Sequence, residues 1–228
     1  MFKVLLWDVD ATLLNFEKAE EAGIRGCFEK YNLGECTDEM LENYKVINRG
    51  YWQAMERGEI EKPMLLVKRF EDFLNAYGLD SSVAAGFNEL YQILLGETVV
   101  FYDNALETMQ ALKGKVLQCA VTNGTKVAQD GKLRNSGLDK EFDHVFISEV
   151  VGIEKPNKGF FDAVFAKIGE YALEEVLIVG DSLTSDIRGG VNAGIKTCWF
   201  NPKGVVNTSE LKPDYEIRDI GEVLEIVK

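Results

Sequence analysis

Residues 3–12 read Lys3-Val-Leu-Leu-Trp-Asp8-Val-Asp10-Ala-Thr12, an apolar run that ends on two carboxylates one residue apart. In open parallel sheets, ligands bind at the carboxyl ends of the strands. A carboxylate there can attack phosphorus and form an aspartyl-phosphate. A second carboxyl that holds a proton can protonate the departing alkoxide and later activate water. We therefore interpret Asp8 as a nucleophile and Asp10 as its acid/base partner. Because an isolated Asp-x-Asp is also typical of a polar turn after a buried strand, the other motifs must support this interpretation.

The composition limits the class of protein. The chain has 228 residues, 46% of them hydrophobic, which is enough for one large domain or two unequal ones with a sizeable core. The net charge of -13 argues against a nucleic-acid-binding surface. No signal-peptide pattern is present and no apolar run approaches the roughly 20 residues that span a bilayer, so we expect a cytoplasmic protein with neither nucleic-acid nor membrane partners. Without a CxxC pair, the four cysteines are expected to be reduced and buried.

Unalternated apolar runs indicate strands that are buried on both faces of a parallel sheet. They recur at Val4–Trp7, Val116–Val121, His144–Ile147, Val176–Val179 and Thr197–Phe200. Helical periodicity fills the intervals, and Gly194 is expected to end the helix before the last run. The alternation predicts an α/β fold with a Rossmann-like, doubly wound parallel sheet and right-handed crossovers.

The interval of residues 16–97 departs from this alternation, because no strand signal interrupts it. Helices are predicted at Glu17–Tyr31, Glu39–Arg57, Pro63–Tyr77 and Ser82–Leu95. The simplest organisation is a Rossmann-like catalytic core of residues 1–15 and 98–228, with a helical cap domain of residues 16–97 inserted over the active edge. Several aromatic residues of this block could line a substrate pocket, but their helical spacing favours core packing: Tyr44, Tyr51, Trp52, Phe70 and Phe73.

Two further motifs suit phosphate binding. Thr122-Asn123-Gly124 follows a strand, where a hydroxyl and consecutive backbone N–H groups can hold phosphate oxygens, although Asn-Gly is also a common turn pair. Lys155 precedes Pro156, which fixes the local backbone. Its ammonium can reach a transferring phosphoryl group unless it lies in solvent, as loop lysines usually do.

The most specific motif is Gly180-Asp181-Ser-Leu-Thr-Ser-Asp186, which follows a buried strand and delivers two acids to the same sheet edge. Mg²⁺ prefers oxygen ligands and normally takes one or two carboxylates together with substrate phosphate. We expect Asp8 and Asp181 to supply those carboxylates. Asp186 lies at the expected start of a helix. It either contacts and supports the metal ligands or is simply an acid that the helix dipole stabilises at that position. Mg²⁺ and Lys155 would offset the repulsion between these acids and a phosphate dianion.

In this order, the four motifs resemble those of the haloacid dehalogenase (HAD) superfamily of phosphohydrolases, and the resemblance spans essentially the whole chain. It implies a Rossmann-like core with a helical cap inserted after the first motif. It also implies a nucleophile at Asp8, an acid/base at Asp10 that binds Mg²⁺ through its backbone carbonyl, and a metal ligand at Asp181. Phosphate binding is implied for Thr122, Asn123 and Lys155.

Within the superfamily, three runs resemble the pyrimidine 5'-nucleotidase subgroup: Ile47 to Trp52, Gly180 to Gly190 and Thr197 to Pro202. The resemblance implies Mg²⁺-dependent release of phosphate from a small phosphate ester such as dUMP, dTMP or UMP. The chain departs from the pattern at Ala11, where many members carry glycine. A positive φ at this position would cost strain on the order of 1 kcal/mol.

Other functions on the same fold stay open. A sugar-phosphate phosphatase or phosphomutase would use the same residues, and a phosphonatase, which by family resemblance uses a cap lysine, could draw on Lys18, Lys45 or Lys62. A catalytically silent binding module is the alternative from another class, since fold does not fix function. A dehalogenase is disfavoured because that branch lacks an acid matching Asp10. A serine hydrolase is disfavoured because no Gly-x-Ser-x-Gly is present and the sole histidine, His144, begins an expected strand.

Overall fold

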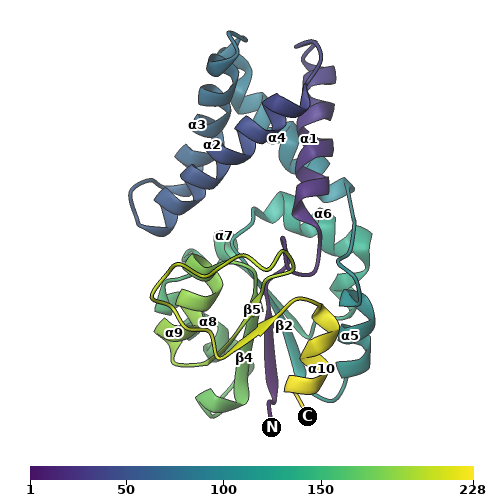
Figure 1. The fold of residues 1–228 in the computed structure, drawn as a ribbon, viewed down its shortest axis with the longest axis vertical. Helices are drawn as coiled ribbons and strands as arrows, with labels where there is room; N and C mark the ends of the chain where they lie inside the picture. The colour runs from purple at the N-terminus through teal and green to yellow at the C-terminus, as the bar shows by residue number, and fades with distance from the viewer. The chain divides into compact units, whose positions relative to one another are not determined.

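Six parallel strands form one sheet in the computed structural model, in the spatial order β3-β2-β1-β4-β5-β6. Figure 1 labels β2, β4 and β5 of this sheet. The strands are β1 (Val4–Trp7), β2 (Leu117–Thr122), β3 (His144–Ile147), β4 (Val176–Gly180), β5 (Lys196–Phe200) and β6 (Tyr215–Ile217). The first strand lies in the middle, paired with β2 on one side and with β4 on the other. The connection order therefore reverses beside β1, which is the switch point where open α/β sheets bind ligands.

The structure describes residues 1–228, which divide into two compact units. The core unit comprises Met1–Phe16 and Val99–Lys228, and the helical unit comprises Glu17–Thr98. The core unit contains the whole sheet and the helices α5 (Ala105–Leu112), α6 (Lys126–Ser136), α7 (Ser148–Val151), α8 (Lys158–Ile168), α9 (Arg188–Ala193) and α10 (Val223–Ile226). It also contains three short 3₁₀ turns: η2 (Leu138–Lys140), η3 (Leu173–Glu175) and η5 (Ile220–Glu222).

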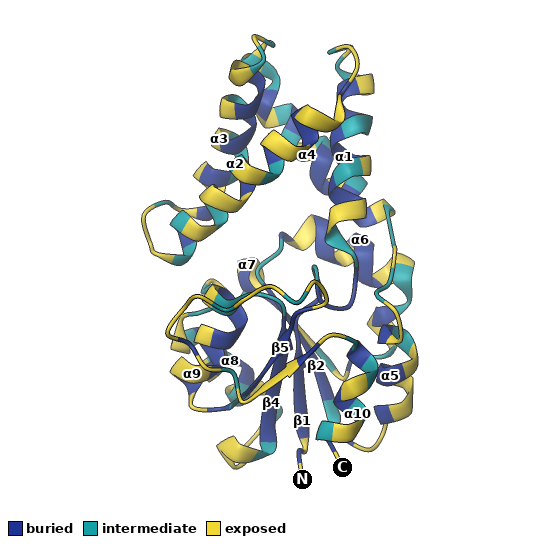
Figure 2. Ribbon diagram, viewed as in Figure 1, coloured by how far each residue is buried: buried dark blue, intermediate teal, exposed yellow.

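Helices cover both faces of the sheet. Side chains of α5, α6 and α10 pack in one apolar cluster with Leu5 and Trp7 of β1, whereas side chains of α8 and α9 pack in another with Val4 and Leu6. All four β1 side chains are completely buried (Figure 2). Since neighbouring residues of a strand point to opposite faces, a strand covered on both sides has no polar alternation. This confirms the doubly wound parallel sheet that the unalternated runs predict.

The two segments of the core unit meet where the helical unit is inserted. The Asn15 N–H donates to the Val100 carbonyl over 2.7 Å, and the Tyr102 N–H donates to the Leu13 carbonyl over 3.0 Å. A single antiparallel bridge joins Leu14 to Phe101 between them. The points at which the chain leaves and re-enters the core unit are therefore fastened to each other within that unit.

Two features of the core unit differ from the sequence-based expectation. The edge strand β6 was not predicted, because it has only three residues and two of them are exposed. Asp186 does not start a regular helix but lies in a π-helical turn, η4 (Leu183–Ile187), that precedes α9. In this turn the Ile187 N–H donates to the Ser182 carbonyl five residues earlier over 3.1 Å, and the Asp186 side chain accepts a hydrogen bond from the Ser182 N–H over 3.1 Å.

The helical unit is built around aromatic side chains. It contains α1 (Phe16–Lys30), α2 (Asp38–Glu56), α3 (Lys62–Ala76), the 3₁₀ turn η1 (Ser81–Val83) and α4 (Ala84–Glu97), with α1 starting at the last residue of the core unit. The Tyr44 ring stacks on Phe70 with centroids 5.2 Å apart, and Phe70 lies 4.9 Å from Phe87. Because Tyr44, Phe70 and Phe73 are completely buried, these three aromatics form core, as their spacing favours. Tyr51 and Trp52 are only partly buried.

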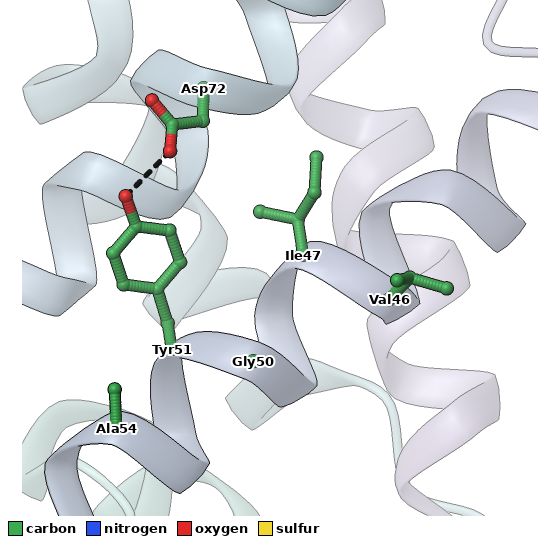
Figure 3. A pocket seen from close by; sticks show the side chains of 6 residues that line it. All are labelled: Val46, Ile47, Gly50, Tyr51, Ala54 and Asp72. Carbon is green, nitrogen blue, oxygen red and sulfur yellow. Dashed lines mark hydrogen bonds between the residues drawn. The ribbon is translucent and has the colours of Figure 1, made fainter.

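Tyr51 lines an open groove of about 330 Å³ on α2 and α3 (Figure 3). The other lining residues are Val46, Ile47, Gly50, Ala54 and Asp72. The Tyr51 hydroxyl donates to Asp72 Oδ2 over 2.6 Å, and burial together with this carboxylate raises the pKa of Tyr51 to about 12. The phenol therefore stays protonated at neutral pH, and the groove joins an apolar wall to one polar end.

A polar chain crosses the interior of the helical unit. Arg69, which is 1% exposed, donates to Asn48 Oδ1 over 2.7 Å, and the Asn48 amide donates to Glu20 Oε1 over 2.8 Å. Burial raises the pKa of Glu20 to about 7, although the Asn48 hydrogen bond and the Arg69 charge both lower it. The desolvation of the Glu20 carboxylate therefore outweighs its attraction to Arg69, to which it is linked only through the Asn48 amide.

We expect Glu20→Gln to change how stability depends on pH. An acid whose pKa is raised by folding stabilises the protein fully below its unfolded pKa and loses that contribution as the pH rises through its folded pKa. For Glu20 the window runs from 4.5 to about 7, so the ionised form costs up to about 3 kcal/mol at pH 8. Glu20→Gln should therefore be more stable than the wild type at pH 8 but not at pH 4.5, as measured by urea unfolding.

The matched control is Glu29→Gln, an exposed position on the same helix. This variant is expected to follow the wild type within about 0.5 kcal/mol at each pH. If Glu20→Gln lost stability at pH 8, pairing with Arg69 would outweigh desolvation.

The cysteines Cys27, Cys36, Cys119 and Cys198 are all free and buried. Burial raises the pKa of the Cys119 thiol to about 12, so this group is protonated at neutral pH. None of the helices combines the length and the apolar character that crossing a membrane demands.

Candidate functional site

Three neighbouring strands place the predicted site residues at one edge of the sheet. Asp8 follows β1, Asp181 follows β4, and Thr122 ends β2. Trp7, the last residue of β1, is in register with Ala120 of β2 and Val179 of β4, so the three strands end at nearly the same level. Parallel pairing thus gathers side chains that lie far apart in the sequence at the switch point of the sheet.

Lys155 lies directly against Asp8. Its Nζ is 2.9 Å from Asp8 Oδ1 and 2.6 Å from Asp186 Oδ1, and it also donates to the Val121 carbonyl over 2.5 Å. The side chain is 1% exposed, so this lysine is not an ordinary solvent-exposed loop residue. All three protons of the ammonium therefore have partners, and the positive charge is fixed beside the predicted nucleophile.

The Asn123 side chain holds Lys155 in place. Its Nδ2 donates to the Lys155 carbonyl over 2.8 Å, while its Oδ1 accepts from the Lys155 N–H over 2.9 Å. These two hydrogen bonds, which we call the Asn123 bracket, fix the backbone of Lys155. The side-chain amide is thus occupied, and the group that Asn123 can still offer to a phosphate is its backbone N–H.

Thr12 links the two carboxylates expected to hold a metal. Its hydroxyl lies 3.0 Å from Asp8 Oδ2 and 3.5 Å from Asp181 Oδ1, and it accepts a hydrogen bond from the Asp181 N–H over 3.1 Å. The single hydroxyl proton favours the shorter contact, to Asp8. Thr12 was included in the first motif without a role, and the structure shows that it fixes the orientation of Asp8.

The Asp10 carboxylate points to α6 and not to Asp8. Its Oδ1 forms an ion pair with Lys132, and its Oδ2 accepts from Gln129 Nε2 over 2.6 Å. The sequence analysis missed both partners. The available signal was their spacing of three residues, which places both polar side chains on the same helix face.

The carboxylates of Asp8, Asp181 and Asp186 form an acidic cluster, in which one oxygen from each lies within 4.8 Å of the others. The two Asp186 oxygens are already taken by Lys155 and by the Ser182 N–H. Both Asp8 oxygens also have partners, Lys155 and the Thr12 hydroxyl, whereas Asp181 Oδ1 has only the longer 3.5 Å approach of that hydroxyl. Such hard, negatively charged oxygens fit Mg²⁺. A Cβ at Gly180 would lie 2.3 Å from the Asp186 carboxyl carbon, so this close approach requires glycine.

Burial and mutual repulsion determine the charge state of the cluster. Burial raises the pKa of Asp8 to about 7; Lys155 opposes this shift, and the Asp186 charge adds to it. Burial and the carboxylates of Asp8 and Asp186 also raise the pKa of Asp181 well above its ordinary value. Burial alone would lower the pKa of Lys155, but Asp186 and Asp8 raise it. The site thus has an excess of acid that a bound cation would neutralise.

Ala11 adopts the left-handed conformation between Asp10 and Thr12, with φ at 63°. A Cβ in this region costs about 1–2 kcal/mol, whereas glycine costs about 0.5–1 kcal/mol in lost chain entropy. We expect Ala11→Gly to raise the free energy of unfolding by about 0.5–1 kcal/mol in urea. The matched control, Ala22→Gly at an exposed position of α1, should lower it by about 1 kcal/mol. Equal losses in both variants would contradict the strain at Ala11.

Comparison with known proteins places this geometry in a family. Pyrimidine 5'-nucleotidase PynA of Streptococcus pneumoniae is 32% identical over 98% of this chain and 94% of its own length. Pyrimidine 5'-nucleotidase YjjG of Escherichia coli is 30% identical over 95% and 96%. The magnesium-bound crystal structure of the HAD-hydrolase-type protein YfnB of Bacillus subtilis superimposes with a TM-score of 0.94 at 38% identity, covering 100% of this chain and 99% of that one.

The family profile described as haloacid dehalogenase-like hydrolase matches residues 5–200, a range that holds all four motifs and both segments of the core unit. The match confirms the resemblance that the four ordered motifs indicate. The chain belongs to the haloacid dehalogenase-like hydrolase family.

Proposed function

We propose that the protein is a Mg²⁺-dependent phosphomonoester hydrolase that works through an aspartyl-phosphate on Asp8. The observation that carries this proposal is the setting of the Asp8 side chain, which lies at the end of the central strand between Lys155 at 2.9 Å and Thr12 at 3.0 Å. One carboxylate oxygen is bound by an ammonium and the other by a hydroxyl. A buried carboxylate oriented in this way suits attack on phosphorus, and the Lys155 proton that now binds Asp8 would pass to a phosphoryl oxygen when Asp8 becomes esterified.

In the first step, an Asp8 oxygen bonds to phosphorus while the bond from phosphorus to the ester oxygen breaks. Asp10 gives its proton to that departing oxygen, which leaves as an alcohol. In the second step, a water oxygen attacks the phosphorus, Asp10 takes a proton from this water, and the bond between Asp8 and phosphorus breaks. Inorganic phosphate results, with Asp8 again a carboxylate and Asp10 again protonated, as at the start. Lys155, Thr122 and the Asn123 N–H would bind the phosphoryl oxygens in both steps.

Asp8, Asp181 and the Asp10 backbone carbonyl would hold the Mg²⁺, and Asp186 supports the site by binding Lys155 and the Ser182 N–H. When bound, Mg²⁺ supplies positive charge that offsets the carboxylates and the phosphate dianion. The excess of buried acid in the structure supports this assignment, because two carboxylates with raised pKa values lie side by side. Lys155 remains the cation that the chain itself provides.

For the substrate, we propose a pyrimidine nucleoside 5'-monophosphate, with the helical unit acting as the cap that selects it. Support comes from the two relatives named pyrimidine 5'-nucleotidase, which match this chain over nearly their whole length. The run Ile47 to Trp52, which resembles that subgroup, lies in α2 and includes three residues of the groove in Figure 3: Ile47, Gly50 and Tyr51. The sugar-phosphate phosphatase or phosphomutase is the alternative on the same fold.

A panel of phosphate esters, assayed for phosphate release with and without Mg²⁺, tests the proposal. We expect UMP, dUMP and dTMP to be hydrolysed faster than glucose 6-phosphate and ribose 5-phosphate, and removal of Mg²⁺ with a chelator to reduce every rate by at least about 100-fold. Faster hydrolysis of the sugar phosphates would overturn the nucleotide assignment and keep the reaction. Isomerisation without phosphate release would indicate a mutase, and no reaction with any ester would indicate a binding module.

A further inference from the structure

We propose that Lys132 and Gln129 are positioning residues that hold the Asp10 carboxyl for its proton transfers, an assignment that rests on the proposed function. Lys132 forms an ion pair with Asp10 Oδ1, and Gln129 Nε2 donates to Asp10 Oδ2 over 2.6 Å. Each carboxyl oxygen thus has its own donor, and both donors come from one face of α6. Neither residue belongs to the four sequence motifs.

Burying Lys132 and Gln129 destabilises the fold unless their polar groups have partners. Lys132 is 1% exposed and Gln129 is completely buried. A buried ammonium or amide destabilises a protein unless it has a partner, and an apolar side chain of similar size would fill either position at lower cost. The Lys132 ammonium also lies 4.9 Å from the centre of the Phe16 ring, a weaker contact than its ion pair. The carboxyl of Asp10 is therefore the group around which both side chains are arranged.

Two details show that the Gln129 amide is placed for Asp10. Its Oε1 is buried without a hydrogen-bond partner, so no second bond on the amide oxygen sets its position. A Cβ at Gly124 would lie 2.3 Å from Gln129 Nε2, so the absence of a side chain at residue 124 makes room for the amide. The same loop carries the Asn123 bracket for Lys155, and α6 follows it directly. One segment therefore sets both the phosphate-binding cation and the acid/base group.

The two hydrogen bonds leave the carboxyl able to react. A carboxyl group has about four lone-pair positions, and the two donors use one on each oxygen. One of the other positions can carry the proton that goes to the departing ester oxygen in the first step, and the same position can take the proton of water in the second. Proton transfer requires a defined distance and direction, so a carboxyl that rotates freely would lose rate in both steps.

The test separates the two steps by choosing the leaving group. p-Nitrophenyl phosphate releases a phenolate that needs no proton, so formation of the aspartyl-phosphate from it does not require Asp10, whereas hydrolysis of that intermediate does. For the Mg²⁺-loaded variants Lys132→Met and Gln129→Leu, we expect a burst of one nitrophenolate per site at a rate within about 3-fold of wild type. Later turnovers, and all turnovers of UMP, should slow about 30- to 100-fold.

Lys126→Met is the matched control, because Lys126 lies on the same helix but is exposed and pairs with Asp130. It should behave as the wild type with both esters. Gly124→Ala keeps Gln129 in the sequence but places a Cβ against its amide, so this variant should reproduce the Gln129→Leu kinetics. Thermal unfolding checks that each variant is folded. Wild-type turnover of UMP in both α6 variants, or an equal loss of the nitrophenolate burst and of UMP turnover, would overturn the positioning role. A wild type that releases phosphate from neither ester would overturn the proposed function itself.

Discussion

Asp8→Asn is expected to lower Mg²⁺-dependent phosphate release by about 10⁴-fold or more, because an amide cannot form the aspartyl-phosphate. The fold should survive. Lys155 keeps Asp186 as a partner at 2.6 Å, so its buried ammonium is still paired. Steady-state phosphate release from UMP measures the loss, and acid quenching with ³²P-labelled substrate tests for the intermediate.

Asp8→Asn should also be at least as stable as the wild type at pH 8. Burial raises the pKa of Asp8 to about 7, so its contribution to stability is present below the unfolded value of 3.8 and is lost as the pH rises through 7. At pH 8 the wild type therefore pays for a buried charge that asparagine does not carry. Asp162→Asn, which removes an exposed carboxylate paired with Lys158, is the control and should keep full activity. Turnover by Asp8→Asn within 10-fold of wild type would rule out the nucleophile.

Lys155→Met is expected to lower the free energy of unfolding by about 3–5 kcal/mol at neutral pH. Removing the ammonium leaves Asp8 and Asp186 as buried carboxylates that have lost their shared cation. The amide of Asn123 does not compensate, because it binds only the backbone of this residue. Phosphate release should fall as well, since the variant removes the ammonium that contacts Asp8. Urea unfolding at pH 7 measures the effect.

The matched control for Lys155→Met is Lys158→Met, which removes an exposed lysine three residues away that pairs with Asp162 across one turn of α8. Its expected cost is below about 0.5 kcal/mol. Adding Asp186→Asn to Lys155→Met should restore part of the stability, because it removes one of the unpaired charges. If both lysine variants lost the same amount, the buried ion pairs would not be the source of the effect.

The parallel strands could be predicted from the sequence for a physical reason. A strand covered on both faces must be apolar at every position, and Val4–Trp7 and Val176–Gly180 satisfy this rule without interruption. Carboxyl ends of parallel strands meet at one edge, so acids that follow such runs converge whatever their distance in the chain. Asp8 and Asp181 could therefore be placed together, and only the short, exposed edge strand β6 lacked a signal.

The contacts that orient these groups could not be read in the same way. Asn123 was assigned to phosphate from its motif, but its amide binds the backbone of Lys155, a pairing that depends on how two loops approach each other. Lys132 and Gln129 lie on a helix whose other charged residues are exposed, and the three-residue spacing that places them on one face does not distinguish a solvated lysine from a buried one. Side-chain pairing between distant segments is a property of the packed structure, not of local periodicity.

The hydrogen bonds that join Asn15 to Val100 and Leu13 to Tyr102 give the chain an unusual kind of modularity. Because hydrogen bonds join the two ends of the inserted segment within the core unit, the length and composition of that segment can change without displacing Asp8 or its neighbours. A lineage of such proteins can thus change its inserted helical unit while the strand ends and their carboxylates stay in place.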